Sequence, residues 1–241
     1  MGILYVDTLE PQSGTTLTVG ETGQNTVVGG NTIKLNTLKD AGGNTLFTSD
    51  GSGTLSSVNS GFGGSMVLIQ SQTGANVADI SFTTGITSSY GEYIFKFYGI
   101  NPATDNGSFG FQASTDGGSS YGVTITSTFF DSYNAESGGT PAGPAYEGAW
   151  DLAQSTSYQA ISQGGSNEAD HCSAGTLHIF NPSSTVYMKQ FYARTKGVYY
   201  ADYTQDFLPA GYFNTASALN AFQFKCGSGN FDGTIKMFGV K

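Results

Sequence analysis

Charged residues, cysteines and long apolar runs are all scarce in this sequence. Asp, Glu, Lys and Arg make up 11% of its 241 residues, whereas they make up about 25% of an average soluble domain. Few charges remain for the ion pairs that support exposed helices, and apolar residues do not recur with a helical period over any useful length. These absences argue against a helical protein.

Cysteine usage and hydropathy exclude further classes. Two cysteines, Cys172 and Cys226, are too few for a disulfide framework, so we expect two reduced thiols. No run of about 18 apolar residues is present, which predicts no membrane insertion. The N-terminal sequence MGILYVD lacks the basic start and the long apolar centre of a signal peptide.

Basic residues are absent from a long central segment. The formal net charge is −9, and no Lys or Arg occurs between Lys96 and Lys189. The same interval holds Asp105, Asp116, Asp131, Glu136, Glu147, Asp151, Glu168 and Asp170. This balance disfavours nucleic acid as a partner, because a phosphate backbone requires a basic surface. An acidic face keeps an exposed particle soluble, and a cation-dependent site is the alternative.

Glycine and aromatic residues are abundant instead, at 35 residues and 13% of the chain. In the first sixty residues, short apolar segments recur about every ten residues between Gly-, Asn- and Asp-rich turns, a pattern typical of all-β structure. These segments are Leu17–Val19, Val27–Val28, Ile33–Leu35 with Leu38, Leu46–Phe47, and Leu55 with Val58. Each is too small to cover its own apolar face, so we expect that the segment leans on the rest of the chain or that several copies wrap around one axis.

Longer strands follow a glycine-rich boundary at residues 60–65. We expect them at 66–72, 77–82, 92–100, 109–114, 121–130, 176–180, 186–193, 211–214, 221–226 and 234–240. The Asp-Gly turn at 115–119 predicts a hairpin between its flanking strands. Residues 131–173 are weakly periodic and read as a long loop or insertion. The whole predicts an all-β protein, with a short N-terminal β shaft or anchor at 1–60 and a β-sandwich, jelly-roll-like head at 61–241.

Signals for catalysis or metal binding are weak. No Gly-x-Ser-x-Gly elbow is present, and His171, His178 and Cys172 lack a fourth zinc ligand at a recognisable spacing. The carboxylate pairs Asp202 with Asp206 and Glu147 with Asp151 are interpreted as surface acids rather than as a glycosidase pair. We therefore expect no catalytic residue, no cofactor and no metal ligand set.

Aromatic residues gather in two segments predicted to be loops. Aromatic faces stack on sugar rings, so these side chains are candidate glycan contacts, and packing in the core or at a subunit interface is the alternative. The candidates are Tyr146, Trp150, Tyr199, Tyr200 and Tyr203, with Tyr133 nearby. Lys189, Arg194 and Lys196 form a local basic cluster that would meet an acidic polysaccharide or an acidic patch of a neighbouring subunit.

Several phrases of the sequence resemble a known family. The segments VDTLEPQSGTTLTVG and IKLNTLKDAGGNTLFTSDGSGTLSSVNS are similar to N-terminal parts of small virion fibre proteins of tailed bacteriophages, notably marine ones. LIQSQTGANVADISFTTGI, EYIFKFYGINPATDNGSFGFQASTDGGSSY and the ending FQFKCGSGNFDGTIKMFGVK are similar to the globular part of the same group. The resemblance covers nearly the whole chain but marks no receptor-contacting residue.

The resemblance implies a homotrimeric structural protein located in the virion. We expect a tail fibre or receptor-binding protein whose head contacts host surface glycans and whose N-terminal segment attaches to another virion protein of the tail or capsid. A head fibre or capsid-decorating protein attached through its N-terminus is the alternative. An enzyme, such as a polysaccharide depolymerase, is a third and weaker interpretation, because no acid/base set emerges.

Overall fold

The computed structural model describes residues 35–52, 54–56, 58, 65–139 and 141–241, and it contains strands but no helix in these ranges. The all-β prediction is therefore confirmed for the described residues. The chain divides into two compact units, Met1–Phe62 and Gly63–Lys241.

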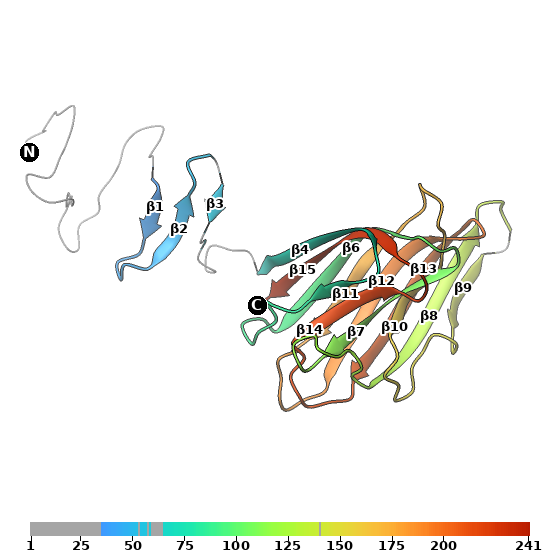
Figure 1. Cartoon of the computed structure of the whole chain (residues 1–241). Helices are drawn as coiled ribbons and strands as arrows, with labels where there is room; N and C mark the ends of the chain where they lie inside the picture. Colours follow the sequence, from blue (N-terminus) through green and yellow to red (C-terminus); the bar gives the residue numbers. More distant parts are fainter. Residues whose placement is uncertain (1–34, 53, 57, 59–64, 140) are drawn as a thin grey trace, which may run out of the picture. The chain divides into compact units, whose positions relative to one another are not determined.

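The described part of the first unit is a small antiparallel sheet in the order β1-β2-β3 (Figure 1). The strands are β1 (Thr37–Lys39), β2 (Thr45–Ser49) and β3 (Leu55–Ser56). Asp40 closes the first turn, because its carboxylate Oδ1 accepts the Asn44 backbone N–H at 2.8 Å. Asp50 closes the second turn in the same way, accepting the Ser52 backbone N–H at 2.7 Å.

Apolar side chains of this sheet stay accessible to solvent. None of the residues described between 35 and 58 is buried, and Leu55 is 54% exposed. The strands predicted around Leu38, Leu46–Phe47 and Leu55 are present, whereas Leu35 and Val58 lie outside strands. The strands predicted at Leu17–Val19 and Val27–Val28, with Ile33, lie outside the described residues.

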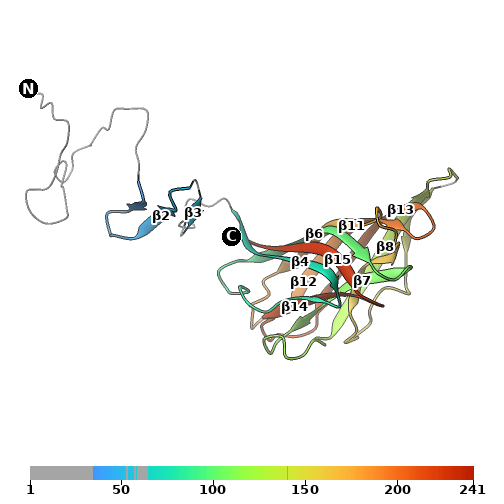
Figure 2. The ribbon, with the colours of Figure 1, turned by 45° about the horizontal axis from the view of Figure 1, so that its top comes forward.

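In residues 65–139 and 141–241 the second unit contains twelve strands joined into one large, nearly closed sheet (Figures 1 and 2). The strands are β4 (Met66–Val77), β5 (Ile80–Phe82), β6 (Glu92–Pro102), β7 (Gly107–Ser114), β8 (Ile125–Ala135), β9 (Ala142–Tyr146), β10 (Gln159–Gly165), β11 (Ser173–Phe180), β12 (Lys189–Tyr199), β13 (Tyr203–Phe213), β14 (Ala221–Cys226) and β15 (Phe231–Val240). All of their pairings are antiparallel.

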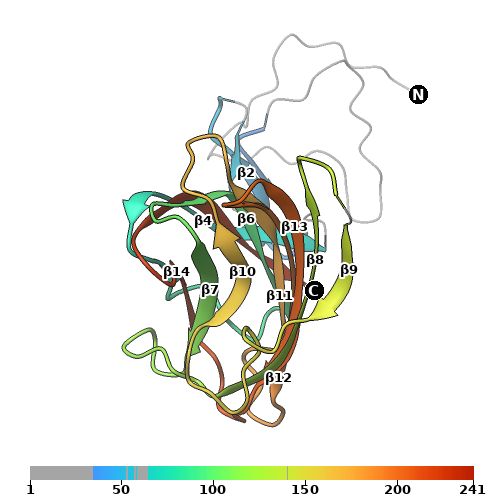
Figure 3. The ribbon, with the colours of Figure 1, turned by 90° about the vertical axis from the view of Figure 1, so that its right-hand side faces the viewer.

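The sheet folds so that one run of strands faces another. One run follows the order β9-β8-β13-β12-β11-β6-β15-β4, and the other follows β10-β7-β14-β5. The two runs join where Gly165 of β10 pairs with Tyr199 of β12. An end-on view shows β7, β10 and β14 opposite β6, β11 and β13 (Figure 3).

Phenylalanine fills the space between the facing strands. Phe224 of β14 is fully buried, and its ring centroid lies 5.0 Å from Phe95 and 5.4 Å from Phe97, both on β6. Phe111 of β7 meets Phe191 of β12 edge to face at 5.2 Å. Each such ring buries a large apolar area, so the aromatic content of the chain accounts for most of this core.

Two predictions for the head are wrong. Residues 131–173 are not one long loop, because β8 continues to Ala135 and because β9 and β10 lie within the span. Ile161 of β10 is fully buried, yet the Gly, Ser and Gln around it mask the apolar signal. The turn at 115–119 does not join a hairpin either, since β7 pairs with β10 and β14 rather than with β8.

Candidate functional site

Tyrosines from three neighbouring strands form a row on the inner face of the sheet. Tyr199 ends β12, Tyr203 opens β13 directly opposite it, and Tyr133 lies diagonally across on β8. The rings of Tyr199 and Tyr203 stack at 5.7 Å with planes 8° apart, and those of Tyr203 and Tyr133 stack at 5.4 Å. Because side chains alternate between the two faces of a strand, all three tyrosines lie on the same face of the sheet. The register of the strands then places them next to one another.

Tyr200 extends the row beyond the end of β12. Its ring centroid lies 4.4 Å from that of Tyr199, and it is 40% exposed. Burial of the phenol is the main cause that raises the pKa of Tyr199 to about 12, and a hydrogen bond with the Tyr200 hydroxyl is the second cause. The Tyr199 phenol is therefore a neutral hydrogen-bond donor at neutral pH.

A layer of polar side chains lies next to the tyrosine row on the same inner face. Asp131 of β8 is 5% exposed, and its Oδ2 accepts hydrogen bonds from Gln163 Nε2 at 3.1 Å and from Gln205 Nε2 at 2.5 Å. Gln205 is also 5% exposed, and its Oε1 has no hydrogen-bond partner among the described residues. A buried acceptor without a donor is costly, so Gln205 Oε1 has unmet hydrogen-bonding capacity beside the tyrosine row.

These groups surround a hollow of about 270 Å³, which we call the tyrosine hollow. It is lined by Asp131, Tyr133, Glu147, Gln163, Tyr199, Tyr203 and Gln205. No basic side chain is among these lining residues. The hollow therefore offers aromatic surface, hydroxyl and amide groups and two carboxylates to a ligand, but nothing that neutralises an anion.

The remaining two candidates lie elsewhere. Tyr146 packs against Phe130 at 5.2 Å on the exposed face of β8 and β9, and its hydroxyl donates to Asp151 Oδ2. That hydrogen bond is the main cause that raises the pKa of Tyr146. Trp150 packs on the buried cluster of Phe129, Ala160 and Phe207. The structure thus brings Tyr199, Tyr200 and Tyr203 together, but not Tyr146 and Trp150.

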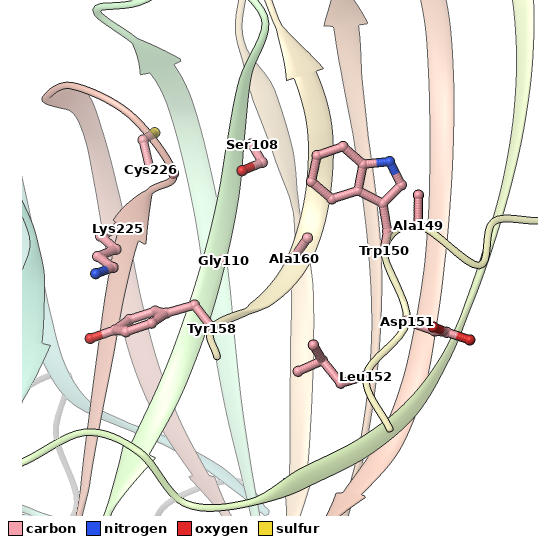
Figure 4. Close-up of a pocket in the computed structure, with 11 residues that line it drawn as sticks. Ser108, Gly110, Ala149, Trp150, Asp151, Leu152, Tyr158, Ala160, Lys225 and Cys226 are labelled. Atoms are coloured by element: carbon pink, nitrogen blue, oxygen red, sulfur yellow. The ribbon is translucent and has the colours of Figure 1, made fainter. Parts of the chain in front are cut away.

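Trp150 lines a second hollow of about 240 Å³ (Figure 4). Tyr158 and Leu152 form further parts of its wall. The ammonium of Lys225 lies 3.9 Å from the Tyr158 ring centroid, and the Tyr158 hydroxyl donates to Gln223. These polar groups already have partners, so this hollow shows less unmet hydrogen-bonding capacity than the tyrosine hollow.

The basic cluster inferred from sequence is only partly present in the fold, because Arg194 and Lys196 both lie exposed on the outer face of β12 and Lys189 does not join them. Lys189 is fully buried, and its Nζ donates to the carbonyls of Thr215 and Ser217 at 3.1 and 2.7 Å. Arg194 forms an ion pair with Asp206 at 2.7 Å on the outer face. Strand alternation sends Lys189 inward and Arg194 outward, so their proximity in sequence creates no common surface.

One member of each acidic pair is engaged by a neighbouring side chain, and both cysteines are free thiols. Asp206 is engaged by Arg194, and Asp151 accepts the Tyr146 hydroxyl, so each suspected carboxylate pair has one member held elsewhere. Cys172 and Cys226 are both free thiols, the first exposed and the second buried.

Comparison of the chain with protein-family models, with curated proteins and with solved structures returns no match. The resemblance to phage fibre proteins therefore stays a prediction from sequence. Only the geometry of the tyrosine hollow supports a functional site.

Sequence reasoning missed the polar half of this site. Asp131, Gln163 and Gln205 are far apart in the chain. The register of β8 with β13 brings Asp131 and Gln205 together, and Gln163 of β10 reaches Asp131 from another part of the sheet. A signal was available for two of them, because Asp131 and Gln205 occupy inward positions of alternating strands where an apolar residue is the rule.

Proposed function

We propose that this protein is a bacteriophage virion fibre protein whose head binds a neutral host surface glycan at the tyrosine hollow. The observation that carries the glycan assignment is the buried Gln205 Oε1, which has no donor in the described part of the chain and lies beside the Asp131 carboxylate and a row of stacked tyrosines. The phage assignment rests on the sequence resemblance described above.

Sugar hydroxyls suit the groups that line the hollow. They donate to the Gln205 carbonyl oxygen and to carboxylates, and they accept from tyrosine hydroxyls. The outer face of Tyr133, which is 40% exposed, offers aromatic surface to the apolar face of a pyranose ring. Small-molecule sites commonly combine aromatic walls with a few placed polar groups in this way.

The charge of the hollow selects against acidic glycans. Asp131 and Glu147 line it, and no Lys or Arg is among its lining residues. An anionic sugar would bring its carboxylate towards these groups in a partly desolvated space, where like charges repel strongly. Neutral hexoses and amino sugars meet no such repulsion.

The exposed apolar side chains of the first unit support a trimer. Leu35, Leu55 and Val58 are 45%, 54% and 43% exposed, and none of the described residues between 35 and 58 is buried. A sheet this small does not bury its own apolar surface. Wrapping three copies around one axis would cover it, giving a shaft that attaches to another virion protein and carries β-sandwich-like heads.

Inhibition of adsorption tests the proposal. Host cells are first incubated with the purified full-length protein and then challenged with particles that carry it. We expect the wild-type protein and the control Y187L, which alters a 74% exposed tyrosine outside the tyrosine hollow, to block adsorption. We expect Y203L not to block it. Equal blocking by Y203L would contradict a role of the hollow.

The position of the protein on the intact particle distinguishes the capsid-decorating alternative from this proposal. Electron microscopy of intact particles with an antibody against the head would label the tail for a receptor-binding fibre. Label confined to the capsid, with no inhibition of adsorption by the purified protein, would favour decoration instead.

A further inference from the structure

An imidazole and two carboxylates converge where two connections of the large sheet meet. Glu168 and His171 lie between β10 and β11, and Asp202 lies in the turn between β12 and β13. One donor atom of each residue lies within 4.8 Å of the donors of the other two. A divalent ion with bonds of about 2.1 Å holds its ligands roughly 3–4 Å apart, so small rotations of the two exposed carboxylates complete the set.

The ring of His171 is not used by the fold. Its Nε2 lies 3.8 Å from Glu168 Oε2, which is too far for a hydrogen bond, and its Nδ1 is buried without a partner among the described residues. The other histidine of the chain behaves differently. His178 Nδ1 lies 2.5 Å from a carboxylate oxygen of Glu92, and its ring stacks on Tyr192 at 4.5 Å.

Backbone contacts hold both connections in place and leave the donor atoms free. Asn101 Nδ2 donates to the carbonyls of Glu168 and His171 at 2.7 and 2.5 Å. The Asp202 backbone N–H donates to the Tyr199 carbonyl at 3.0 Å, and its own carbonyl accepts from Glu136 at 2.9 Å. No ion pair to Lys or Arg engages Glu168 or Asp202 in the described part of the chain.

The surroundings add negative charge. Asp105 Oδ1 accepts the backbone N–H of Asn167 at 3.3 Å, next to Glu168 in the chain, and Asp170 lies in the same connection. The connection belongs to the interval without Lys or Arg. Uncompensated carboxylates at one end of a domain raise the local concentration of cations.

We infer that Glu168, His171 and Asp202 form a binding site for a divalent transition metal ion of the zinc type. Imidazole together with carboxylates suits zinc and similar ions, whereas calcium and magnesium prefer sites built from oxygen alone. Three protein ligands leave a further coordination position for water. The ion would tie the β10–β11 connection to the β12–β13 turn, and this inference does not depend on glycan binding.

Calorimetric titration of metal-free full-length protein with zinc chloride tests the site. We expect one ion bound per chain for the wild type. E168Q, H171A and D202N should each weaken binding by at least about tenfold, because each removes one of three ligands. Asn at position 202 preserves the left-handed backbone of Asp202, whose φ is 60°.

Matched controls separate the site from general surface charge. D170N removes a carboxylate that lies in the same connection but is not one of the three ligands, so it should weaken zinc binding by much less than the ligand substitutions do. H178A removes the other histidine and should leave zinc affinity unchanged. Substitution of cobalt provides a second readout, since the visible absorption of bound cobalt should change in H171A and not in H178A. Far-ultraviolet circular dichroism confirms that each variant is folded.

Three results would overturn the inference. They are the absence of stoichiometric zinc binding by the wild type, unchanged zinc affinity in folded H171A, and equal competition by calcium chloride. The last would replace the transition-metal site by an oxygen-ligand site.

Discussion

At the scale of single residues, the two cysteines differ most clearly in chemistry. Burial raises the pKa of Cys226 to about 12, while Cys172 is exposed. Because the thiolate is the reactive form, we predict one rapidly reacting thiol in the native protein and two after denaturation. Titration with a disulfide reagent measures this, and C172S should abolish the rapid phase. Rapid reaction of Cys226 in native C172S would show that the core around β14 is more open than the structure indicates.

Lys189 is a buried base, and its burial determines whether the free energy of unfolding rises or falls with pH. Desolvation lowers the pKa of Lys189 in the folded protein. Between this lowered pKa and the ordinary value of about 10.4, the unfolded chain binds more protons, so the contribution of Lys189 to the free energy of unfolding rises with pH.

The comparison of wild type with K189M tests this effect. Urea unfolding at about pH 8 and about pH 10 should show the difference in unfolding free energy shifting towards the wild type at the higher pH. A difference that is independent of pH, or that shifts towards K189M, would mean that the buried amine does not lose its proton more easily in the fold.

At the scale of elements, Gly164 controls the position of the tyrosine row. Its φ is 61°, and a Cβ there would lie 1.9 Å from Cε2 of Tyr199. We predict that G164A lowers the free energy of unfolding by more than about 1 kcal/mol and displaces the Tyr199 ring. Denaturant unfolding and near-ultraviolet circular dichroism measure the two effects.

Gly138 is the matched control for this substitution. Its φ is 74°, but a Cβ there would meet nothing within 4 Å. G138A therefore carries the backbone strain without the clash. Equal destabilisation and equal tyrosine signals in the two variants would show that contact with Tyr199 is not the cause.

Strands in which apolar and polar residues alternate clearly were predictable from the sequence, and strands without this pattern were missed. Apolar and polar side chains alternate cleanly from Phe222 to Cys226, and β14 has the predicted bounds Ala221–Cys226. Gln159–Gly165 is buried but carries Gln, Ser and Gly, so its strand was missed. Periodicity reports which face is buried and not which strand is the neighbour, so the partners of β7 were not predictable from its turn.

The candidate site was predictable to a similar extent. Aromatic density pointed to Tyr199 and Tyr203, although both belong to strands rather than to a loop. The polar groups of the tyrosine hollow depend on long-range register, which composition does not carry. Trp150 was a candidate ligand contact because it lies in a polar segment, but its side chain packs onto Phe129 and Phe207.

At the scale of the whole molecule, the division after Phe62 predicts that folding of the head and association of the chains can be measured separately. The head has its own aromatic core, so residues 63–241 should fold as a soluble monomer. The full-length chain should be a trimer, because the exposed apolar side chains of the first unit need partners. Light scattering gives both masses. A monomeric full-length protein would contradict the shaft, and an insoluble fragment would contradict an autonomous head.

The proposed function depends on binding of a neutral glycan at the tyrosine hollow. The most direct test is binding of labelled full-length protein to an array of neutral, amino and acidic oligosaccharides, with Y203L and Y187L measured in parallel. We predict signals on neutral or amino sugars that fall at least about tenfold in Y203L and remain in Y187L. Binding of Y203L as strong as wild type, or a preference for acidic sugars, would contradict the proposed function.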